Sequence, residues 1–256
     1  MSGAGRLLGV GVGPGDPELL TLKAVRALEQ ADLIAYFAKA GNRSHALSVV
    51  AGFLPRGLER LALEYPVTTE LDRFDPEYRR QIDAFYADSA LLLAAHLEAG
   101  RTVAVLSEGD PLFFGSYMHL HVRLAHRFEA EVIPGVTGMS GGWSSAQLPI
   151  CQGDDVFSVI PATLDEATLS ARLASSEAAV IMKVGRNLAK VRRSLAASGR
   201  LERAVYVERA TQPGALTLPL TQKADDAAPY FSLVLVPGWS SLEFESPLWT
   251  PSEEGR

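Results

Sequence analysis

A short acidic turn after an apolar run is the first stretch of the sequence that could carry chemistry. Residues 103–106 are all apolar, as in a parallel strand buried on both faces, and the run ends at 107–111, Ser-Glu-Gly-Asp-Pro. Ligands of open α/β sheets bind beyond the carboxyl ends of the strands, so Glu108 and Asp110 stand where a small molecule would bind. A structural role is the alternative, because Asp110 is a good N-cap and Pro111 suits the first position of a helix.

Positive side chains follow another expected strand. The strand predicted at 32–36 ends in a polar loop that carries Lys39, Arg43 and His45, and Ser44 is expected to cap the helix that comes next. Cations at the end of a strand could bind an acidic ligand. They could equally belong to a loop whose charges face only solvent, which is the ordinary place for charged side chains.

Glycine-rich turns recur at two other strand ends. Gly11 and Gly13 precede Pro14 and Gly15, and the stretch 134–138, Pro-Gly-Val-Thr-Gly, follows a short apolar segment. Small residues allow the backbone to approach a ligand or another helix closely. A dinucleotide fingerprint is weak here, because its third glycine is absent and Pro14 has no amide donor; the chain also lacks a P-loop sequence.

Several kinds of site and partner are disfavoured. His119 and His121 are two residues apart and would point in different directions from a helix, so we expect no metal site there or elsewhere. The single cysteine, Cys151, excludes an internal disulfide framework and a cysteine-rich zinc site. The net charge of -6 argues against binding of nucleic acid through bulk electrostatics.

Composition and length predict a folded protein of the cytoplasm. The 256 residues are 47% hydrophobic, which is normal for one large or two ordinary domains. The first residues lack the features of a signal peptide, and no apolar run approaches the roughly 18 residues of a membrane span. We therefore expect cytoplasmic localisation and no membrane partner.

Apolar segments that alternate with helical patterns predict an α/β fold. Strands are expected at 7–12, 32–36, 58–63, 103–106 and 131–133, and then at 157–160, 178–182, 204–208, 215–219 and 231–236. The first expected helix carries an apolar stripe at Leu19, Leu22, Val25 and Leu28, and a helix at 112–125 is expected to follow the acidic turn. No helix is expected between the last two strands, so part of the second sheet should be antiparallel.

These elements predict two α/β domains. An N-terminal domain with a largely parallel sheet is expected at 1–135, and a C-terminal domain with a mixed sheet at 136–244. Residues 245–256 contain two prolines and three glutamates and are expected to form a poorly ordered tail.

Four blocks taken together resemble the tetrapyrrole (corrin/porphyrin) methylase family. They are GVGPGDPELLTLKAVRAL at 11–28, SEGDPLFFGSY at 107–117, EVIPGVTGMSG at 131–141 and VIMKVGRN at 180–187. Two more blocks, AYFAKAGNRSHA at 35–46 and LEYPVTTE at 63–70, are similar to those of members that act on precorrin-2. The resemblance implies a homodimer and an active site in the cleft between the two domains.

The resemblance also implies an activity and a set of site residues. The activity is transfer of a methyl group from S-adenosyl-L-methionine to C20 of precorrin-2, which gives precorrin-3A and S-adenosyl-L-homocysteine during cobalamin biosynthesis. The implied cofactor-binding residues are Pro14, Glu108, Gly109, Asp110, Phe113, Thr137, Gly138, Met182 and Ala210. The implied substrate-binding residues are Lys39, Arg43, His45, Tyr65, Lys183 and Arg186. A base that takes up a proton after the transfer is open among Tyr36, Glu108 and Tyr117.

Two departures from the family pattern limit what can be carried over. Family members that methylate uroporphyrinogen III usually have Gly-Gly-Asp where this chain has Glu108, Gly109 and Asp110, and an aspartate where it has Phe37. The acid–base scheme of those relatives should therefore not be transferred. The alternatives are a methyltransferase for the cobalt-containing substrate, a non-catalytic tetrapyrrole-binding protein and, disfavoured by the missing glycine, a nicotinamide oxidoreductase.

Overall fold

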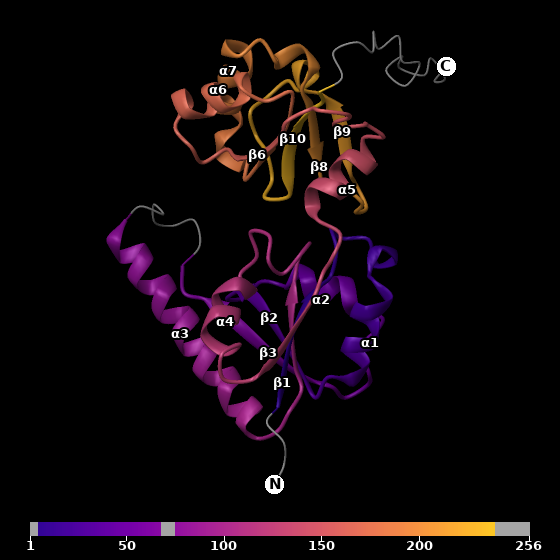
Figure 1. Cartoon of the computed structure of the whole chain (residues 1–256), viewed down its shortest axis with the longest axis vertical. Coiled ribbons are helices and arrows are strands. Elements are labelled where there is room, and N and C mark those ends of the chain that lie inside the picture. Colours follow the sequence, from indigo (N-terminus) through magenta and orange to yellow (C-terminus); the bar gives the residue numbers. More distant parts are fainter. Residues whose placement is uncertain (1–4, 68–74, 239–256) are drawn as a thin grey trace. The chain divides into compact units, whose positions relative to one another are not determined.

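The computed structural model describes residues 5–67 and 75–238, which form two compact units (Figure 1). The first unit contains the described residues up to Gly141 together with Thr211–Pro213, and the second contains those from Gly142 to Ala210 and from Gly214 onward. The predicted domain boundaries, 1–135 and 136–244, remain a prediction about which parts of the chain fold independently. The expected tail at 245–256 lies outside the described residues.

The sheet of the first unit is parallel throughout. Its strands are β1 (Arg6–Gly11), β2 (Leu33–Lys39), β3 (Glu59–Tyr65), β4 (Val103–Ser107) and β5 (Glu129–Ile133), in the order β3-β2-β4-β1-β5. Gly11 of β1 pairs with Ser107 of β4, so these two central strands end side by side. The carboxyl ends of all five strands consequently share one edge, where ligands of such sheets bind.

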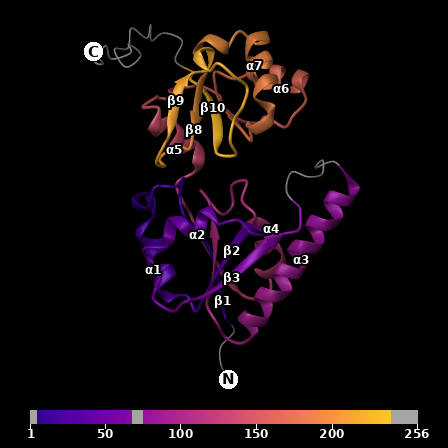
Figure 2. The same cartoon turned by 180° about the vertical axis from the view of Figure 1, so that it is seen from behind.

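Helices cover both faces of this sheet (Figures 1 and 2). A 3₁₀ turn (Pro17–Leu19) precedes α1 (Leu22–Gln30), and α1 and α2 (His45–Val50) pack on one face through Ala24, Leu28, Ala46, Val49 and Val50. On the other face α3 (Pro76–Glu98) and α4 (Tyr117–Leu124) bury Leu93, Leu97, Tyr117, Leu120 and Leu124. The strands are thus apolar on both sides, as the continuous runs in the sequence predict.

Two helices differ from their sequence-based expectation. In α1 the buried residues are Ala24, Ala27 and Leu28, whereas Leu22 is 76% exposed. The reason is that the Thr21 hydroxyl accepts a hydrogen bond from the Ala24 amide (3.1 Å), so the helix starts there and the 3₁₀ turn before it does not continue its periodicity.

The helix expected at 112–125 starts only at Tyr117. Asp110 accepts a hydrogen bond from the Leu112 amide (2.9 Å), which closes a turn instead of capping a helix. Phe114 then has a φ of 54°, a left-handed conformation that α-helices do not contain.

The second unit has the expected mixed sheet. Its strands are β6 (Phe157–Pro161), β7 (Ala178–Met182), β8 (Val205–Glu208), β9 (Leu216–Pro219) and β10 (Ser232–Val236), in the order β6-β7-β10-β8-β9. The β6–β7 pair is parallel, and the other pairs are antiparallel. The predicted fold class, two α/β domains with a largely parallel N-terminal sheet and a mixed C-terminal sheet, is confirmed.

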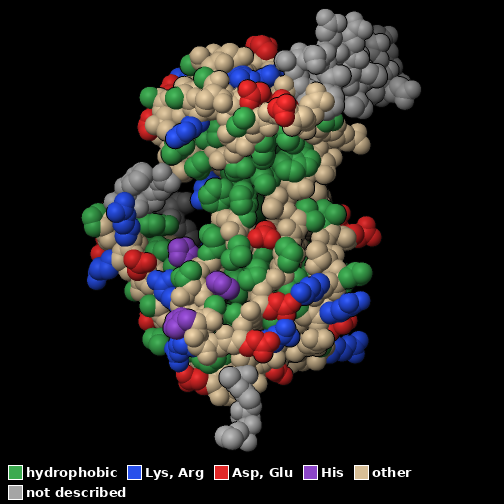
Figure 3. Space-filling view, in the orientation of Figure 1, with side chains coloured by type: hydrophobic (Ala, Val, Ile, Leu, Met, Phe, Trp, Pro, Cys, Tyr) green, Lys and Arg blue, Asp and Glu red, His purple; other side chains and the backbone are tan. Residues whose placement is uncertain are grey.

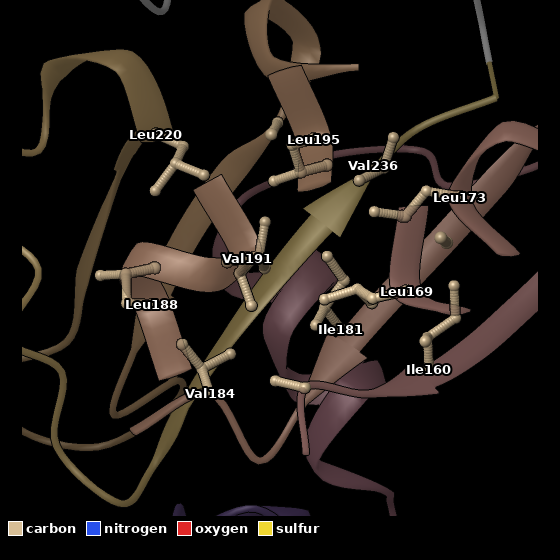
Figure 4. Close-up of a cluster of buried hydrophobic side chains, with 14 of the residues drawn as sticks. Ile160, Leu169, Leu173, Ile181, Val184, Leu188, Val191, Leu195, Leu220 and Val236 are labelled. Atoms are coloured by element: carbon tan, nitrogen blue, oxygen red, sulfur yellow. The ribbon is translucent and has the colours of Figure 1, made fainter. Parts of the chain in front are cut away.

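One hydrophobic core holds the second unit together (Figure 4). Helices α6 (Glu166–Ala174) and α7 (Leu188–Ala197) pack on the sheet, with short 3₁₀ turns at Gly185–Asn187, Leu201–Arg203 and Leu220–Gln222. Their core side chains are Leu169, Leu173, Leu188, Val191 and Leu195, which contact Ile160, Ile181 and Val236 of the strands. Helix α5 (Gly138–Ser145) contains the point at which the chain passes from the first unit to the second.

Charges of both signs are interspersed on the first unit (Figure 3). Glu131 pairs with Arg6 and Lys23, and Arg127 pairs with Glu98 at 2.7 Å. Within residues 5–67 and 75–238, no helix has the length and apolarity needed to cross a membrane.

Candidate functional site

Three backbone segments meet where β1, β4 and β5 end. The Gly109 amide donates a hydrogen bond to the Gly13 carbonyl oxygen (2.8 Å), and the Val12 amide donates to that of Ser107 (2.9 Å). A methyl group added to Gly11 would come within 2.5 Å of the Gly135 nitrogen, and one added to Gly135 would collide with the Gly109 carbonyl oxygen. The glycines of these turns therefore allow three loops to touch at one sheet edge.

Asp110 ties two of these loops together. One carboxylate oxygen accepts from the Leu112 amide (2.9 Å) and the other from the Gly135 amide (3.2 Å). The side chain thus holds the turn after β4 against the loop after β5. Gly109 precedes it with a φ of 64°, a conformation that glycine adopts without steric cost.

Glu108 lies beside the start of α2. Its side chain is 37% exposed, and one carboxyl oxygen is 3.7 Å from Nδ1 of His45. Partial burial raises the pKa of the Glu108 carboxyl, while the nearby His45 and the Ala46 amide oppose that rise. The structure therefore brings together two residues that the sequence placed in separate groups, and the Glu108 carboxyl is a group that can hold or accept a proton.

The expected cationic loop follows β2. Lys39 and Arg43 are exposed, and Ser44 caps α2 by accepting a hydrogen bond from the Leu47 amide (3.4 Å). Tyr36 is half-buried and packs against the core cluster on the α1 and α2 face. The carboxyl ends of β2 and β4 thus carry cations and a carboxyl group at one edge of the first sheet, while Tyr36 lies in the middle of β2.

Tyr117 lies in the core rather than at this edge. It is 0% exposed, its ring packs beneath Gly9, and its hydroxyl is hydrogen-bonded to Nδ1 of His121 (3.1 Å). Burial raises the pKa of Tyr117 to about 12. This environment is that of a packing residue, and it favours Glu108 and Tyr36 over Tyr117 as the proton acceptor.

An aromatic cluster that the sequence did not reveal surrounds Tyr65. The ring of Tyr65 stacks on Phe37 (centroids 5.7 Å apart) and contacts Phe85 (4.7 Å). The Tyr65 hydroxyl is hydrogen-bonded to the Ser116 hydroxyl, which also accepts a hydrogen bond from Tyr86 (3.2 Å). In the parallel register of β2 and β3, Phe37 pairs with Leu63, two residues before Tyr65, so only the strand pairing could have predicted this cluster.

The start of α5 lies against the first glycine loop. Thr137 accepts a hydrogen bond from the Ser140 amide (3.3 Å), and a methyl group added to Gly141 would come within 2.7 Å of the Pro14 Cβ. A methyl group added to Gly138 would meet no atom within 4 Å. Phe113, half-buried, contacts the ring of Phe114 at 4.9 Å.

The remaining expected site residues belong to the second unit. Met182 ends β7, and its carbonyl oxygen accepts a hydrogen bond from the Ala162 amide (2.7 Å). Lys183 follows with a φ of 58°, and Arg186 is exposed in the next 3₁₀ turn. Ala210 is half-buried after β8 and directly precedes the segment Thr211–Pro213 of the first unit.

The described residues hold no group of three or more His, Cys, Asp or Glu side chains that could bind a metal ion. The polar groups at the sheet edge are instead backbone amides and carbonyls, two carboxyl groups and several cations. Such a set suits an organic ligand that carries charges of both signs.

This combination of a parallel sheet, glycine loops at its carboxyl edge and a second mixed sheet defines a class of protein. The family model described as Tetrapyrrole (Corrin/Porphyrin) Methylases matches residues 6–224, and the chain belongs to that family. The resemblance inferred from the sequence blocks is confirmed.

Individual relatives make the comparison more specific. The chain is 68% identical to a Precorrin-2 C(20)-methyltransferase of Sinorhizobium sp over 93% of this chain and 97% of that protein. It is 30% identical to a Cobalt-precorrin-2 C(20)-methyltransferase of Salmonella typhimurium over 91% and 96%, respectively. Its fold matches the crystal structure of a uroporphyrin-III C-methyl transferase from Thermus thermophilus in complex with S-adenyl homocysteine, with a TM-score of 0.64, 26% identity and coverage of 91% and 97%.

Proposed function

We propose that the chain transfers a methyl group from S-adenosyl-L-methionine to C20 of precorrin-2, giving precorrin-3A in cobalamin biosynthesis. The observation that carries the proposal is the 68% identity to a Precorrin-2 C(20)-methyltransferase along nearly the whole of both chains. The acidic turn and glycine loops of the sheet edge supply a physical basis for it.

The cofactor would be held mainly by backbone. S-adenosyl-L-methionine supplies an already activated methyl group, so the protein's contribution is largely positioning. Pro14, Gly109, Thr137 and Gly138 lie on loops that touch at the sheet edge, and the open space around Gly138 leaves room for a ligand. The other residues assigned to it are Glu108, Asp110, Phe113, Met182 and Ala210.

The substrate would be held by cations. Precorrin-2 is a polycarboxylate, and a chain of net charge -6 must attract it locally rather than through its overall field. Lys39 ends β2, Arg43 lies on the loop that follows, and His45 begins α2. Tyr65, Lys183 and Arg186 complete the assigned set.

Glu108 is our candidate for the proton acceptor. Its raised pKa brings the carboxyl closer to the range in which it can take up a proton. Tyr36 is the second candidate, because it is half-buried near the same strand ends.

A cobalt-containing substrate is the second candidate, favoured by the 30% identity to the Salmonella protein. Purified enzyme should therefore be incubated with labelled cofactor and either metal-free or cobalt-loaded substrate, and the new methyl group should be located by NMR. We expect methylation at C20 of the metal-free substrate. Methylation of the cobalt form alone would favour the second candidate, and labelled methyl transfer to neither would favour a tetrapyrrole-binding protein without activity. We further propose a cytoplasmic homodimer.

A further inference from the structure

A three-residue segment after β8 departs from its neighbours in the chain. Thr211–Pro213 packs as part of the first unit, although the residues before and after it belong to the second. Arg209 and Thr211 have φ values of 49° and 64°, which are uncommon for residues other than glycine. Two such residues so close together indicate a path fixed by tertiary contacts rather than by local preference.

The contacts of this segment are made with the first glycine loop. The Gln212 side-chain amide donates a hydrogen bond to the Pro14 carbonyl oxygen (3.0 Å), and the Thr211 hydroxyl accepts one from the Asp16 amide (3.3 Å). Gly15 makes this approach possible, because a methyl group there would collide with Gln212 Cγ and lie 2.8 Å from its Cδ. The segment therefore covers the loop from Pro14 to Asp16.

The loop needs such support because it is flanked by flexible residues. Gly13 and Gly15 have φ values of 77° and 140°, so the chain on both sides of Pro14 has the wide conformational freedom of glycine. On its other side Pro14 meets Gly141 of α5, where no side chain would fit. Gln212 closes the loop by bonding the one polar backbone group that Pro14 has.

We propose that Gln212 is a positioning residue for cofactor binding, which fixes the Pro14 peptide in the conformation that holds S-adenosyl-L-methionine. The inference rests on the proposed function, in which the Pro14 loop is part of the cofactor site. Without the hydrogen bond the loop occupies other conformations for part of the time. The apparent dissociation constant of the cofactor then rises by the inverse of the fraction of molecules whose loop has the binding conformation. Loss of one neutral hydrogen bond predicts a rise of at most about 10-fold.

Three substitutions separate the hydrogen bond from simple packing. Gln212→Met keeps the length and the apolar stem against Gly15 but removes the donor. Gln212→Glu places an acceptor oxygen against the Pro14 carbonyl oxygen and should weaken binding further. Gln212→Lys restores a donor and should bind within about 2-fold of the wild type. Gln222→Met, at an exposed 3₁₀ turn of the second unit, is the matched control.

The measurement is the dissociation constant of S-adenosyl-L-homocysteine by calorimetry, with melting temperature, kcat and tetrapyrrole KM recorded for each variant. We expect the dissociation constant to rise for Gln212→Met while tetrapyrrole KM and kcat at saturating cofactor stay unchanged. An unchanged dissociation constant would overturn the inference, as would an equal rise in Gln222→Met or in Gln212→Lys. If the wild-type chain itself does not bind the ligand, the proposed function fails and the inference fails with it.

Discussion

Glu108 lies close to His45, and this proximity affects the chemistry of its carboxyl group. A carboxyl group that is partly buried has a raised pKa, and its neighbour His45 opposes that rise from 3.7 Å. Sequence reasoning named both residues but assigned one to the cofactor and the other to the substrate. Their proximity depends on α2 returning to the end of β4, which residue types alone do not predict.

The raised pKa has a consequence for stability. Between the unfolded and the folded pKa, the folded chain holds the proton of Glu108 while the unfolded chain has released it, so stability falls as pH rises through this window. Glu108→Gln removes this loss. We expect the difference in melting temperature, Glu108→Gln minus wild type, to increase as pH rises from 4 to 7. A constant difference across this pH range would contradict the assignment.

Substitution of Arg43 tests its assignment to substrate binding. Arg43→Ala should raise the KM for the tetrapyrrole about 10-fold, because one charge-assisted contact to a carboxylate is lost. The dissociation constant for the cofactor should not change. Arg56→Ala is the control, since Arg56 is also exposed but precedes β3, at the opposite end of the strand from the candidate site. If both constants move together in Arg43→Ala, the assignment to the substrate is wrong.

At the scale of elements, the glycine loops after β1, β4 and β5 position the backbone groups of the candidate site. Their small residues predicted close backbone approach to a ligand or another helix, and the structure places the backbones of Gly11, Gly109 and Gly135 in contact with one another. The sequence pattern gave a wrong result where a side-chain hydrogen bond determined the residue at which a helix begins. With Thr21 as its cap, α1 buries a different face from the predicted one. The turn closed by Asp110 precedes α4, which therefore begins at Tyr117 rather than at 112.

Two glycines of one loop should respond differently to the same substitution. Gly135→Ala would force a methyl group against the Gly109 carbonyl oxygen, so we expect a loss of several kcal/mol in the free energy of unfolding. Gly138→Ala meets no atom within 4 Å and begins α5, so its stability should match the wild type to within about 1 kcal/mol.

Chemical denaturation measures these changes, and calorimetry with S-adenosyl-L-homocysteine measures the site. Because the proposed cofactor position lies in the open space at Gly138, we expect Gly138→Ala to bind the ligand more weakly while remaining folded. Unchanged affinity would place the cofactor away from this residue. Equal stability of the two variants would contradict the contact between the loops after β4 and β5.

At the scale of the molecule, two sheets and their types could be predicted because each strand carries its own apolar signal. The mixed second sheet followed from strands without a helix between them. The assignment of Thr211–Pro213 to the first unit could not be predicted, since nothing local in those residues indicates which sheet they pack with. Long-range contacts of loops, such as Gln212 with Pro14, depend on the complete fold.

Each unit has its own hydrophobic core, which predicts that a core defect stays local. Leu169 of α6 is fully buried in the second core, so Leu169→Ala should cost about 2–5 kcal/mol there. In hydrogen exchange followed by mass spectrometry, amides of β7 and β10 should lose protection while those of β1 and β4 keep it. Leu216→Ala, at a 44% exposed position of β9, should change neither sheet. Equal loss of protection in both sheets would show that the chain unfolds as one cooperative unit and would overturn the prediction of separate domains.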